Sequence, residues 1–364
     1  MSLEDLRQKI DAVDAQLVTL LNERAAISLE VGQQKVADKS ARYFAPERER
    51  DQFLRLAELH GGGELPKEAL FAIFREIISA SIALQKPMTV AYWGPPGTFT
   101  EMAALQRFGS SALYHDCRSI PEVFGEVERD RADYGVVPVE NSTDGVVTYT
   151  LDMFHETTLK VCAEIFVGIV QNLLTHAKSL DQIQRLYSAP IVIAQCRRWL
   201  DTHLPHVETI EVQPTSKAAE RAAADPQGAA IAPKRAAEVY AIPMLHESIQ
   251  DSPHNRTRFL VIGRNEPPPT GRDKTSALFA VKNEPGSLGR ALRAFEAHNV
   301  NLTMIASRPA KNAAWSTSSS PTSRVTRKTN PSKVPWTICG SSPSTSTCWG
   351  PTRRDEAYGH NQPC

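Results

Sequence analysis

The heptapeptide Gly94-Pro-Pro-Gly-Thr-Phe-Thr100 follows the apolar run Thr89–Trp93 and decides the fold class of the middle of the chain. Such a run predicts a buried strand, and a Gly/Pro turn after it leads into a helix. The backbone amides at that helix start, with the hydroxyls of Thr98 and Thr100, suit a carboxylate. A nucleotide-phosphate loop is not indicated, because no Gly-Lys-Ser/Thr follows.

Two further strings join an apolar strand to a polar turn, Gly135-Val-Val-Pro-Val-Glu-Asn-Ser-Thr-Asp-Gly145 and Asn255-Arg-Thr-Arg-Phe259. Between residue 88 and about residue 266, strands alternate with helical segments, which predicts an α/β domain. The expected strands include Thr89–Trp93, Tyr134–Val139, Glu164–Val170 and Phe259–Gly263. The three motifs in this order resemble those of prephenate dehydratases. That resemblance implies a two-lobed, periplasmic-binding-like domain over residues 88–266 with its site between the lobes.

The resemblance also implies site residues. Prephenate becomes phenylpyruvate by losing its carboxylate and its ring hydroxyl together, and Thr257 would hydrogen-bond the departing oxygen. The residues expected to bind carboxylates or orient the ring are Thr98, Asn141, Ser142, Ser216 and Arg258. Turn or helix capping is the alternative for Ser142 and Ser216. The stretch Ser188-Ala-Pro-Ile-Val192 departs from the family, where Ser-His-Pro-Gln is common.

The N-terminal residues predict three helices. Apolar positions from Leu6 to Val31 recur every three or four residues, which indicates one long helix from Leu3 to Lys35, roughly 50 Å in length. Two shorter helices are expected at Pro46–His60 and Pro66–Gln85. They are too short to cover the long helix, so we expect a homodimer in which two protomers interlock their long helices.

Polar residues interrupt the apolar positions of these helices, and as a set they resemble the all-helical chorismate mutases over residues 1–87. Solvated charges on helix faces are the alternative. By the resemblance, Arg7 of the partner protomer would bind the carboxylates of chorismate together with Arg24 and Arg48. Lys35 and Gln85 would donate to the ether oxygen as its bond breaks. Glu49 would accept from the substrate hydroxyl, with Ser81 assisting. Ala45 stands where enteric relatives carry an acid.

Residues 272–315 follow a Pro-rich linker, Pro267-Pro-Pro-Thr-Gly271. We expect a strand at Thr275–Lys282, a helix at Gly289–His298 and a strand at Asn301–Ser307. This βαβ pattern resembles part of an ACT regulatory domain, which implies a phenylalanine site. Its residues would be Gly286, Ser287, Leu288, Ser307, Arg308 and Pro309. Ala306 departs from the Glu usual in relatives.

Residues 316–364 do not continue that pattern. They hold 10 Ser, 8 Thr and 6 Pro but no Leu, Phe or Met, so they cannot build a core. A disordered tail is one interpretation. A frameshift is the other interpretation. The stretch that begins at Ser316 can be encoded so that the reading frame one base back encodes Glu-Tyr-Phe-Phe-Phe-Ala-Asp-Phe. Either way the ACT domain would be partial, and we expect inhibition by phenylalanine to be weak or absent.

The composition excludes several classes of protein. Lys plus Arg and Asp plus Glu each total 41, so no net field attracts nucleic acid or an anionic membrane. No apolar run approaches the roughly 20 residues of a membrane span, and we expect a cytoplasmic protein without metal or other cofactor. The module order resembles the bifunctional chorismate mutase/prephenate dehydratase family of phenylalanine biosynthesis. A non-catalytic sensor of an aromatic acid and a dehydratase acting on arogenate are the alternatives.

Overall fold

The computed structural model describes residues 1–37, 45–268, 273–279, 284–307, 323–326 and 347–353. These residues fall into two compact units. The helical unit contains Met1–Thr89 and Arg107–Leu113, and the α/β unit contains Val90–Gln106 and Tyr114–Asp355.

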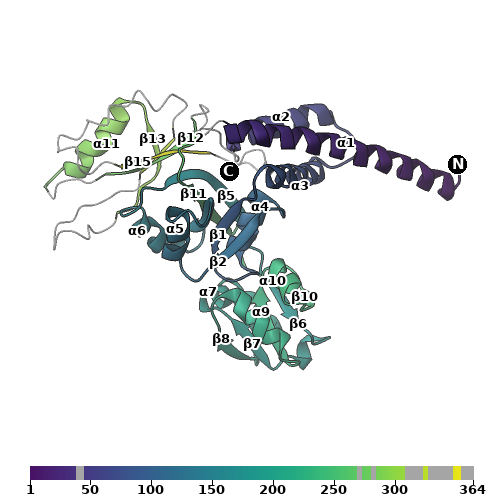
Figure 1. Ribbon diagram of the computed structural model, residues 1–364. Coiled ribbons are helices and arrows are strands. Elements are labelled where there is room, and N and C mark those ends of the chain that lie inside the picture. Colours follow the sequence, from purple (N-terminus) through teal and green to yellow (C-terminus); the bar gives the residue numbers. More distant parts are fainter. Residues whose placement is uncertain (38–44, 269–272, 280–283, 308–322, 327–346, 354–364) are drawn as a thin grey trace. The chain divides into compact units, whose positions relative to one another are not determined.

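Three helices form the helical unit: α1 (Leu3–Ala37), α2 (Pro46–His60) and α3 (Lys67–Gln85) (Figure 1). Pro46 occupies the first turn of α2, where its missing N–H costs nothing, and Gly61 ends that helix with φ +55°. Phe53 of α2 packs edge-on against Phe71 of α3 with ring centroids 5.1 Å apart. The three expected helices are therefore present.

Helix α1 carries a stripe of exposed apolar side chains, which we call the α1 stripe. Its members are Leu6, Ile10, Val13, Leu17, Leu20 and Ile27, each at least 41% exposed. Helix α3 packs on the C-terminal half of α1, where Ser28 and Gly32 are buried. The α1 stripe is thus a large apolar surface that the described part of this chain leaves uncovered.

The first lobe of the α/β unit is a six-stranded sheet in the order β2-β1-β3-β11-β5, with β4 paired to β3. Its strands are β1 (Thr89–Trp93), β2 (Leu113–Cys117), β3 (Tyr134–Asn141), β4 (Gly145–Val146), β5 (Lys160–Gly168) and β11 (Arg256–Gly263). β1 runs parallel to β3, whereas β11 is antiparallel to both of its neighbours. β11 is therefore a central strand that returns late in the sequence to the middle of the sheet.

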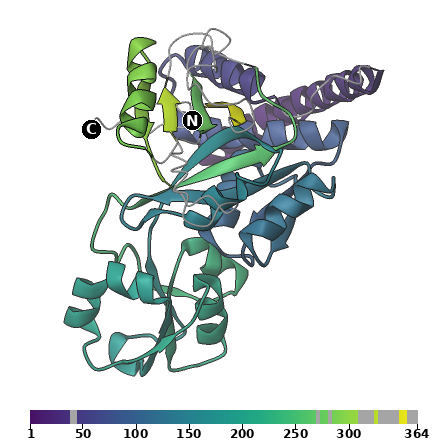
Figure 2. The same ribbon diagram turned by 90° about the vertical axis from the view of Figure 1, so that its left-hand side faces the viewer.

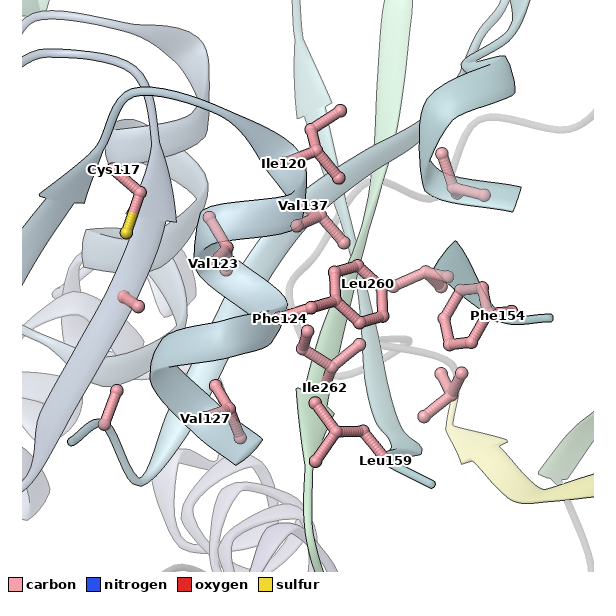
Figure 3. Close-up of a cluster of buried hydrophobic side chains, with 14 of the residues drawn as sticks. Cys117, Ile120, Val123, Phe124, Val127, Val137, Phe154, Leu159, Leu260 and Ile262 are labelled. Atoms are coloured by element: carbon pink, nitrogen blue, oxygen red, sulfur yellow. The ribbon is translucent and has the colours of Figure 1, made fainter. Parts of the chain in front are cut away.

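Helices α4 (Phe99–Phe108), α5 (Ile120–Glu128) and α6 (Thr148–Met153) accompany this sheet. Figure 3 shows α5 packed on the sheet, with Phe124 facing Leu260 and Ile262 of β11. Phe124 and Phe154 meet edge to face at 5.3 Å. Gly135 of β3 permits the close approach of α5 to the sheet, because a Cβ at this position would lie 2.7 Å from the side chain of Val123. The buried core thus fixes β3 and β11, the two strands whose ends carry Asn141 and Thr257.

The second lobe is a five-stranded sheet in the order β10-β6-β9-β7-β8. Its strands are β6 (Asn172–Thr175), β7 (Arg185–Ser188), β8 (Glu208–Glu211), β9 (Gly228–Ala232) and β10 (Met244–His246). Its helices are α7 (Pro190–Gln195), α8 (Arg197–His203), α9 (Thr215–Ala223) and α10 (Lys234–Val239), with a 3₁₀ turn at Leu180–Gln182 (Figure 2). The chain enters this lobe after β5 and leaves it before β11, so the lobes are joined by two crossings. A two-lobed α/β architecture was expected and is confirmed.

The C-terminal part contributes β12 (Asp273–Leu278), α11 (Ser287–Ala297), β13 (Asn301–Met304), β14 (Ser323–Thr326) and β15 (Thr347–Arg353). Its strands form a sheet in the order β13-β14-β12-β15. β12 begins two residues before the expected Thr275, and residues 280–282 of the expected strand lie outside the described residues. α11 begins two residues before the expected Gly289, and β13 ends at Met304 instead of Ser307. Of residues 316–364, the structure describes only β14 and β15, and the rest lie outside the described residues.

Candidate active sites

The first candidate site lies between α1 and α3. Arg24, Ser28, Gly32 and Lys35 recur at intervals of four, four and three residues, so they share one face of α1. Gly32 lets the helices approach, because a Cβ at this position would lie 3.1 Å from the Cα of Gln85. This face of α1 therefore meets α3 at short range.

Two hydrogen-bonded pairs cross this helix contact. Arg24 Nη1 donates to the hydroxyl of Ser81 and, over 3.4 Å, to the carbonyl of Ile77. Lys35 Nζ donates to Gln85 Oε1 over 3.0 Å. The two pairs are one helical turn apart on α3, and they bring together four of the residues that the sequence predicts for this site.

The site is strongly cationic. Burial lowers the pKa of Arg24. Burial also lowers the pKa of Lys35, and the positive charge of Arg48 lowers it further. The exposed Arg48 in the first turn of α2 thus acts electrostatically on Lys35. Three cations around one helix contact suit a substrate with two carboxylates.

Two predicted members of this site have other partners. Arg7 is exposed, forms an ion pair with Glu4 at 3.7 Å, and lies about 25 Å along α1 from Arg24. Glu49 is buried and pairs with Arg107 at 3.1 Å, an arginine at the end of α4 that the sequence did not point to. Arg7 therefore cannot reach the Arg24 site of its own chain.

The second candidate site lies in the first lobe at the ends of β3 and β11. Thr257 is the register partner of Asn141. Asn141 Nδ2 donates to Thr257 Oγ1 over 2.8 Å and to Asn255 Oδ1 over 2.9 Å. Asn141 Oδ1 accepts from the backbone N–H groups of Thr143 and Asp144, at 2.8 and 3.0 Å. Both ends of the Asn141 amide are therefore occupied.

This arrangement sets the direction of the hydrogen bond between Asn141 and the Thr257 hydroxyl. Because the backbone donors take the Asn141 oxygen, the amide nitrogen must face Thr257, and the threonine oxygen must accept. The hydroxyl hydrogen of Thr257 then points elsewhere and can be donated to another group. Thr257 is only 8% exposed, so such a group would meet the hydroxyl in a largely desolvated place.

The other predicted dehydratase residues are distributed around this pair. Ser142 is held in the same turn, where its Oγ accepts from the N–H of Arg256 over 3.0 Å. Thr98 Oγ1 accepts from the N–H of Glu101 over 3.3 Å, which caps the start of α4.

Ser216 is fully buried in the first turn of α9, next to Gly97. It does not cap that helix, because Pro214 is the N-cap residue. Arg258 points to ion pairs with Glu140 and Glu164 instead of joining Thr257.

Two polar contacts join the lobes near these residues, and neither was predicted from the sequence. Gln195 Nε2 of α7 donates to Asp144 Oδ2 over 3.0 Å. Arg235 of α10 binds both oxygens of Glu101, at 3.1 and 3.2 Å. Burial raises the pKa of Asp144, and the Gln195 hydrogen bond opposes this shift. The two lobes are thus held together on the side where the predicted residues lie.

The predicted phenylalanine residues are described only in part. Gly286 has φ +79° and precedes α11, and Ser287 Oγ accepts from Arg290 Nη2 over 2.8 Å. Leu288 is 40% exposed. Ser307 ends the described segment, and Arg308 and Pro309 lie outside the described residues. The described residues contain no group of three His, Cys, Asp or Glu side chains placed to hold a metal ion.

A cationic helical site and a threonine donor site on a two-lobed α/β domain define a chain with a chorismate mutase module and a prephenate dehydratase module. The family models agree: Chorismate mutase type II matches residues 6–86 and Prephenate dehydratase matches residues 90–267. No helix among the described residues is both long and apolar enough to cross a membrane.

Curated relatives combine both modules. A bifunctional chorismate mutase/prephenate dehydratase from Aquifex aeolicus is 48% identical over 86% of this chain and 87% of its own length. Proteins with the same description from Stutzerimonas stutzeri and Escherichia coli are 42% and 30% identical. A solved prephenate dehydratase from Arthrobacter aurescens, in complex with L-Phe, is 30% identical with a TM-score of 0.68, covering 76% of this chain and 92% of that chain. This chain belongs to the bifunctional chorismate mutase/prephenate dehydratase family.

Proposed function

We propose that this enzyme of phenylalanine biosynthesis rearranges chorismate with Arg24, Arg48, Lys35 and Gln85 and converts prephenate to phenylpyruvate with Thr257. The observation that carries the proposal is the Asn141–Thr257 hydrogen bond, because it leaves the threonine hydroxyl as a donor. Both activities are expected of the family, and the residues are our assignment.

The mutase reaction needs no nucleophile or cofactor. Chorismate carries two carboxylates, and guanidinium groups that bind them hold the molecule in its compact, reactive conformer. The ether oxygen gains negative charge as its C–O bond breaks. The Gln85 oxygen accepts from Lys35, so the Gln85 NH₂ group can donate to that ether oxygen, and the positive charge of Lys35 stabilises the negative charge that develops there.

Glu49 is proposed to accept from the substrate hydroxyl and Ser81 to assist in binding. Glu49 is buried against Arg107 at 3.1 Å, and a carboxylate offers only hydrogen-bond acceptors. Ser81 holds the Arg24 guanidinium, so its contribution is to orient that cation.

In the dehydratase reaction the ring becomes aromatic as carboxylate and hydroxide leave. Thr257 is too weak an acid to protonate hydroxide fully before the bond breaks, so its contribution is a hydrogen bond that strengthens as charge develops. Thr98, Asn141, Ser142, Ser216 and Arg258 remain candidates for binding the substrate or supporting the site. Asn141 supports it through Thr257.

A homodimer completes the mutase site in this proposal. The α1 stripe would be buried by α1 of a second copy, which would also bring the partner's Arg7 to the Arg24 site. The support is the exposure of the stripe and the distance of Arg7 from Arg24 within one chain. Sedimentation equilibrium should give a dimer, and a Leu17→Glu variant should shift to monomer and lose mutase activity.

The cytoplasm is the compartment that we infer. The support is chemical: Cys117, Cys162 and Cys196 are buried thiols. Burial raises the pKa of Cys117 and of Cys196 to about 12, so these thiols stay protonated and unreactive. Free cysteines are usual in reducing compartments.

Phenylalanine is the effector that we propose, with weakened action in this chain. The predicted effector residues Gly286 to Leu288 are present, but the sequence after Trp315 lacks the apolar residues that would complete an ACT core. Inhibition of prephenate turnover by phenylalanine should be weak or absent, and restoring the alternative reading frame should return it. Tight inhibition of the chain as it stands would contradict this proposal.

The proposal as a whole is tested by assaying the purified chain. Chorismate should be converted to phenylpyruvate through prephenate, and added prephenate should be converted directly. Binding of prephenate without turnover would favour a sensor. Faster turnover of arogenate than of prephenate would reassign the dehydratase substrate.

A further inference from the structure

The second lobe meets the Gly/Pro turn of the first lobe at Gly97. This glycine is buried with φ +85°, and a Cβ on it would lie 3.1 Å from the Cα of Ala236 in α10. The same Cβ would lie 3.4 Å from the Cβ of Ser216 in the first turn of α9. A glycine permits both the positive φ and this close approach. Gly97 is therefore a point of direct contact between the two lobes.

Glu101, in the first turn of α4, holds the same Gly/Pro turn. Its Oε2 accepts from the backbone N–H of Gly97 over 2.6 Å, and its own backbone N–H donates to Thr98 Oγ1. The amides at this helix start were expected to suit a carboxylate, and the carboxylate on the Gly97 amide is that of Glu101. The side chain of Glu101 thus fixes the conformation of the turn.

Arg235 of α10 binds this carboxylate from the second lobe. Its Nε donates to Glu101 Oε2 over 3.2 Å, and its Nη2 donates to Oε1 over 3.1 Å. Arginine binds a carboxylate most strongly in this bidentate geometry. Glu101 is only 6% exposed, and removal from bulk water strengthens the attraction between the two charges. We call Glu101 and Arg235 the lobe clasp.

The lobe clasp favours the arrangement in which the lobes touch. If the lobes moved apart, the two charge-assisted hydrogen bonds between Arg235 and Glu101 would be lost. If Arg235 lost its charge, the buried carboxylate of Glu101 would lose its cation, and it would be better solvated with the lobes apart. The ion pair therefore shifts the equilibrium between open and closed lobes toward the closed form.

We propose that Glu101 and Arg235 are positioning residues of the dehydratase: their ion pair keeps the lobes closed at the Gly97–Thr98 turn, in the arrangement that binds prephenate. The lobe clasp acts on binding, whereas Thr257 acts on the departing hydroxide. A ligand that binds only the closed form binds more weakly in proportion to the fraction of molecules that are closed. This inference rests on the proposed function of the dehydratase site.

The test uses the full chain with Arg235→Met, which keeps much of the length of the side chain and removes its charge. The KM for prephenate should rise about tenfold, because fewer molecules have closed lobes. The kcat should change less than about twofold, because saturating prephenate restores the closed form. The mutase rate should be unchanged. Arg221→Met, at an exposed arginine of α9, is the matched control and should resemble the parent chain.

Three further variants test whether the two residues act as a pair. Arg235→Lys should have a KM closer to that of the parent chain, because a cation again faces Glu101. Glu101→Gln keeps an oxygen for the Gly97 N–H but removes the charge, so it should also raise KM. The double variant, Arg235→Met with Glu101→Gln, should have a KM no higher than that of Arg235→Met, because one interaction can be lost only once.

The outer contact of Arg235 provides a second control. Its Nη1 lies 3.2 Å from Glu238 of the same helix, and the Glu238 side chain is 51% exposed. This ion pair stays within one lobe, so Glu238→Gln should leave the KM for prephenate within about twofold of the parent value. A rise in KM as large as that of Arg235→Met would assign the effect to α10 itself and overturn the inference.

Hydrogen exchange gives a readout that does not depend on turnover. In Arg235→Met, amides of residues 94–101 and of α10 should both exchange faster, because the two sides of the contact are exposed together when the lobes part. Faster exchange confined to α10 would overturn the inference, since it would indicate fraying of that helix alone.

Unchanged KM in Arg235→Met would overturn the inference, as would a double variant in which the two single effects multiply. A fall in kcat at unchanged KM would also overturn it, because it would assign Arg235 to the chemical step. Equal loss of both activities with a lowered Tm would overturn it in favour of a purely structural role.

Thr257→Val distinguishes this inference from the proposed function. If Thr257→Val keeps its turnover, the proposed role of Thr257 fails. If Thr257→Val is inactive while Arg235→Met keeps the KM of the parent chain, only the present inference fails.

Discussion

Asn141 Nδ2 donates to Thr257 Oγ1 over 2.8 Å, while the oxygen of the same amide is held by two backbone N–H groups. The amide therefore cannot turn over, and the threonine can only accept from it. Because the Thr257 oxygen accepts from Asn141, the hydroxyl hydrogen of Thr257 can be donated to the substrate. This relationship leads to the first prediction.

Asn141→Asp should disable the dehydratase although the two side chains have nearly the same shape. A carboxylate has no hydrogen to donate, so the Thr257 hydroxyl would turn and donate to it. The kcat for prephenate should fall about a hundredfold, of the order found when one transition-state donor is lost. The mutase rate, measured on the same preparation with chorismate, should be unchanged. Full dehydratase activity in this variant would show that the orientation of Thr257 does not matter.

Lys35→Ala should lower mutase turnover at least about a hundredfold, because it removes a donor that acts on the developing charge of the ether oxygen. Turnover of added prephenate should survive, since Lys35 lies in the helical unit and Thr257 in the α/β unit. Steady-state rates on the two substrates check this prediction. If both rates fell together, a folding defect would be the better explanation.

The mutase should also lose activity at alkaline pH earlier than an ordinary lysine would predict. Burial and the nearby charge of Arg48 lower the pKa of Lys35, so Lys35 releases its proton at a lower pH than usual. A neutral Lys35 is a weaker donor, and kcat should decline as pH rises through its pKa. Arg48→Met removes the neighbouring charge and should move this decline to higher pH. A decline at the same pH in both proteins would assign it to another group.

The local fold could be predicted from the sequence because its signals are local. The long first helix was expected at Leu3–Lys35 and is found at Leu3–Ala37, and the second was expected at the observed Pro46–His60. Both follow from the spacing of apolar residues and from Pro46. The strand around Glu164 was expected to begin at that residue, but β5 begins at Lys160. A fully buried glutamate is not what the alternation of a strand suggests, and its ion-pair partners Lys274 and Arg258 come from distant parts of the sequence.

The site was predictable where each of the interacting residues belongs to a recognisable motif. Thr257 lies in the string Asn255-Arg-Thr-Arg-Phe259, and its partner Asn141 lies in the string Gly135-Val-Val-Pro-Val-Glu-Asn-Ser-Thr-Asp-Gly145. Pairs such as Glu49–Arg107 and Gln195–Asp144 join residues more than 50 positions apart with no motif in common. Arg258 was expected in the same site as Thr257 through the resemblance to prephenate dehydratases. Adjacency in a strand instead separates their side chains onto opposite faces.

The most direct measurement of the central claim is the kcat for prephenate of the Thr257→Val variant at saturating substrate. Valine keeps the shape of threonine and removes only the hydroxyl. Thr209→Val, at an exposed position of β8, is the control for the substitution itself. The account predicts that kcat falls at least about a hundredfold, with little change in KM for prephenate or in the mutase rate. Near-normal kcat in Thr257→Val would contradict it.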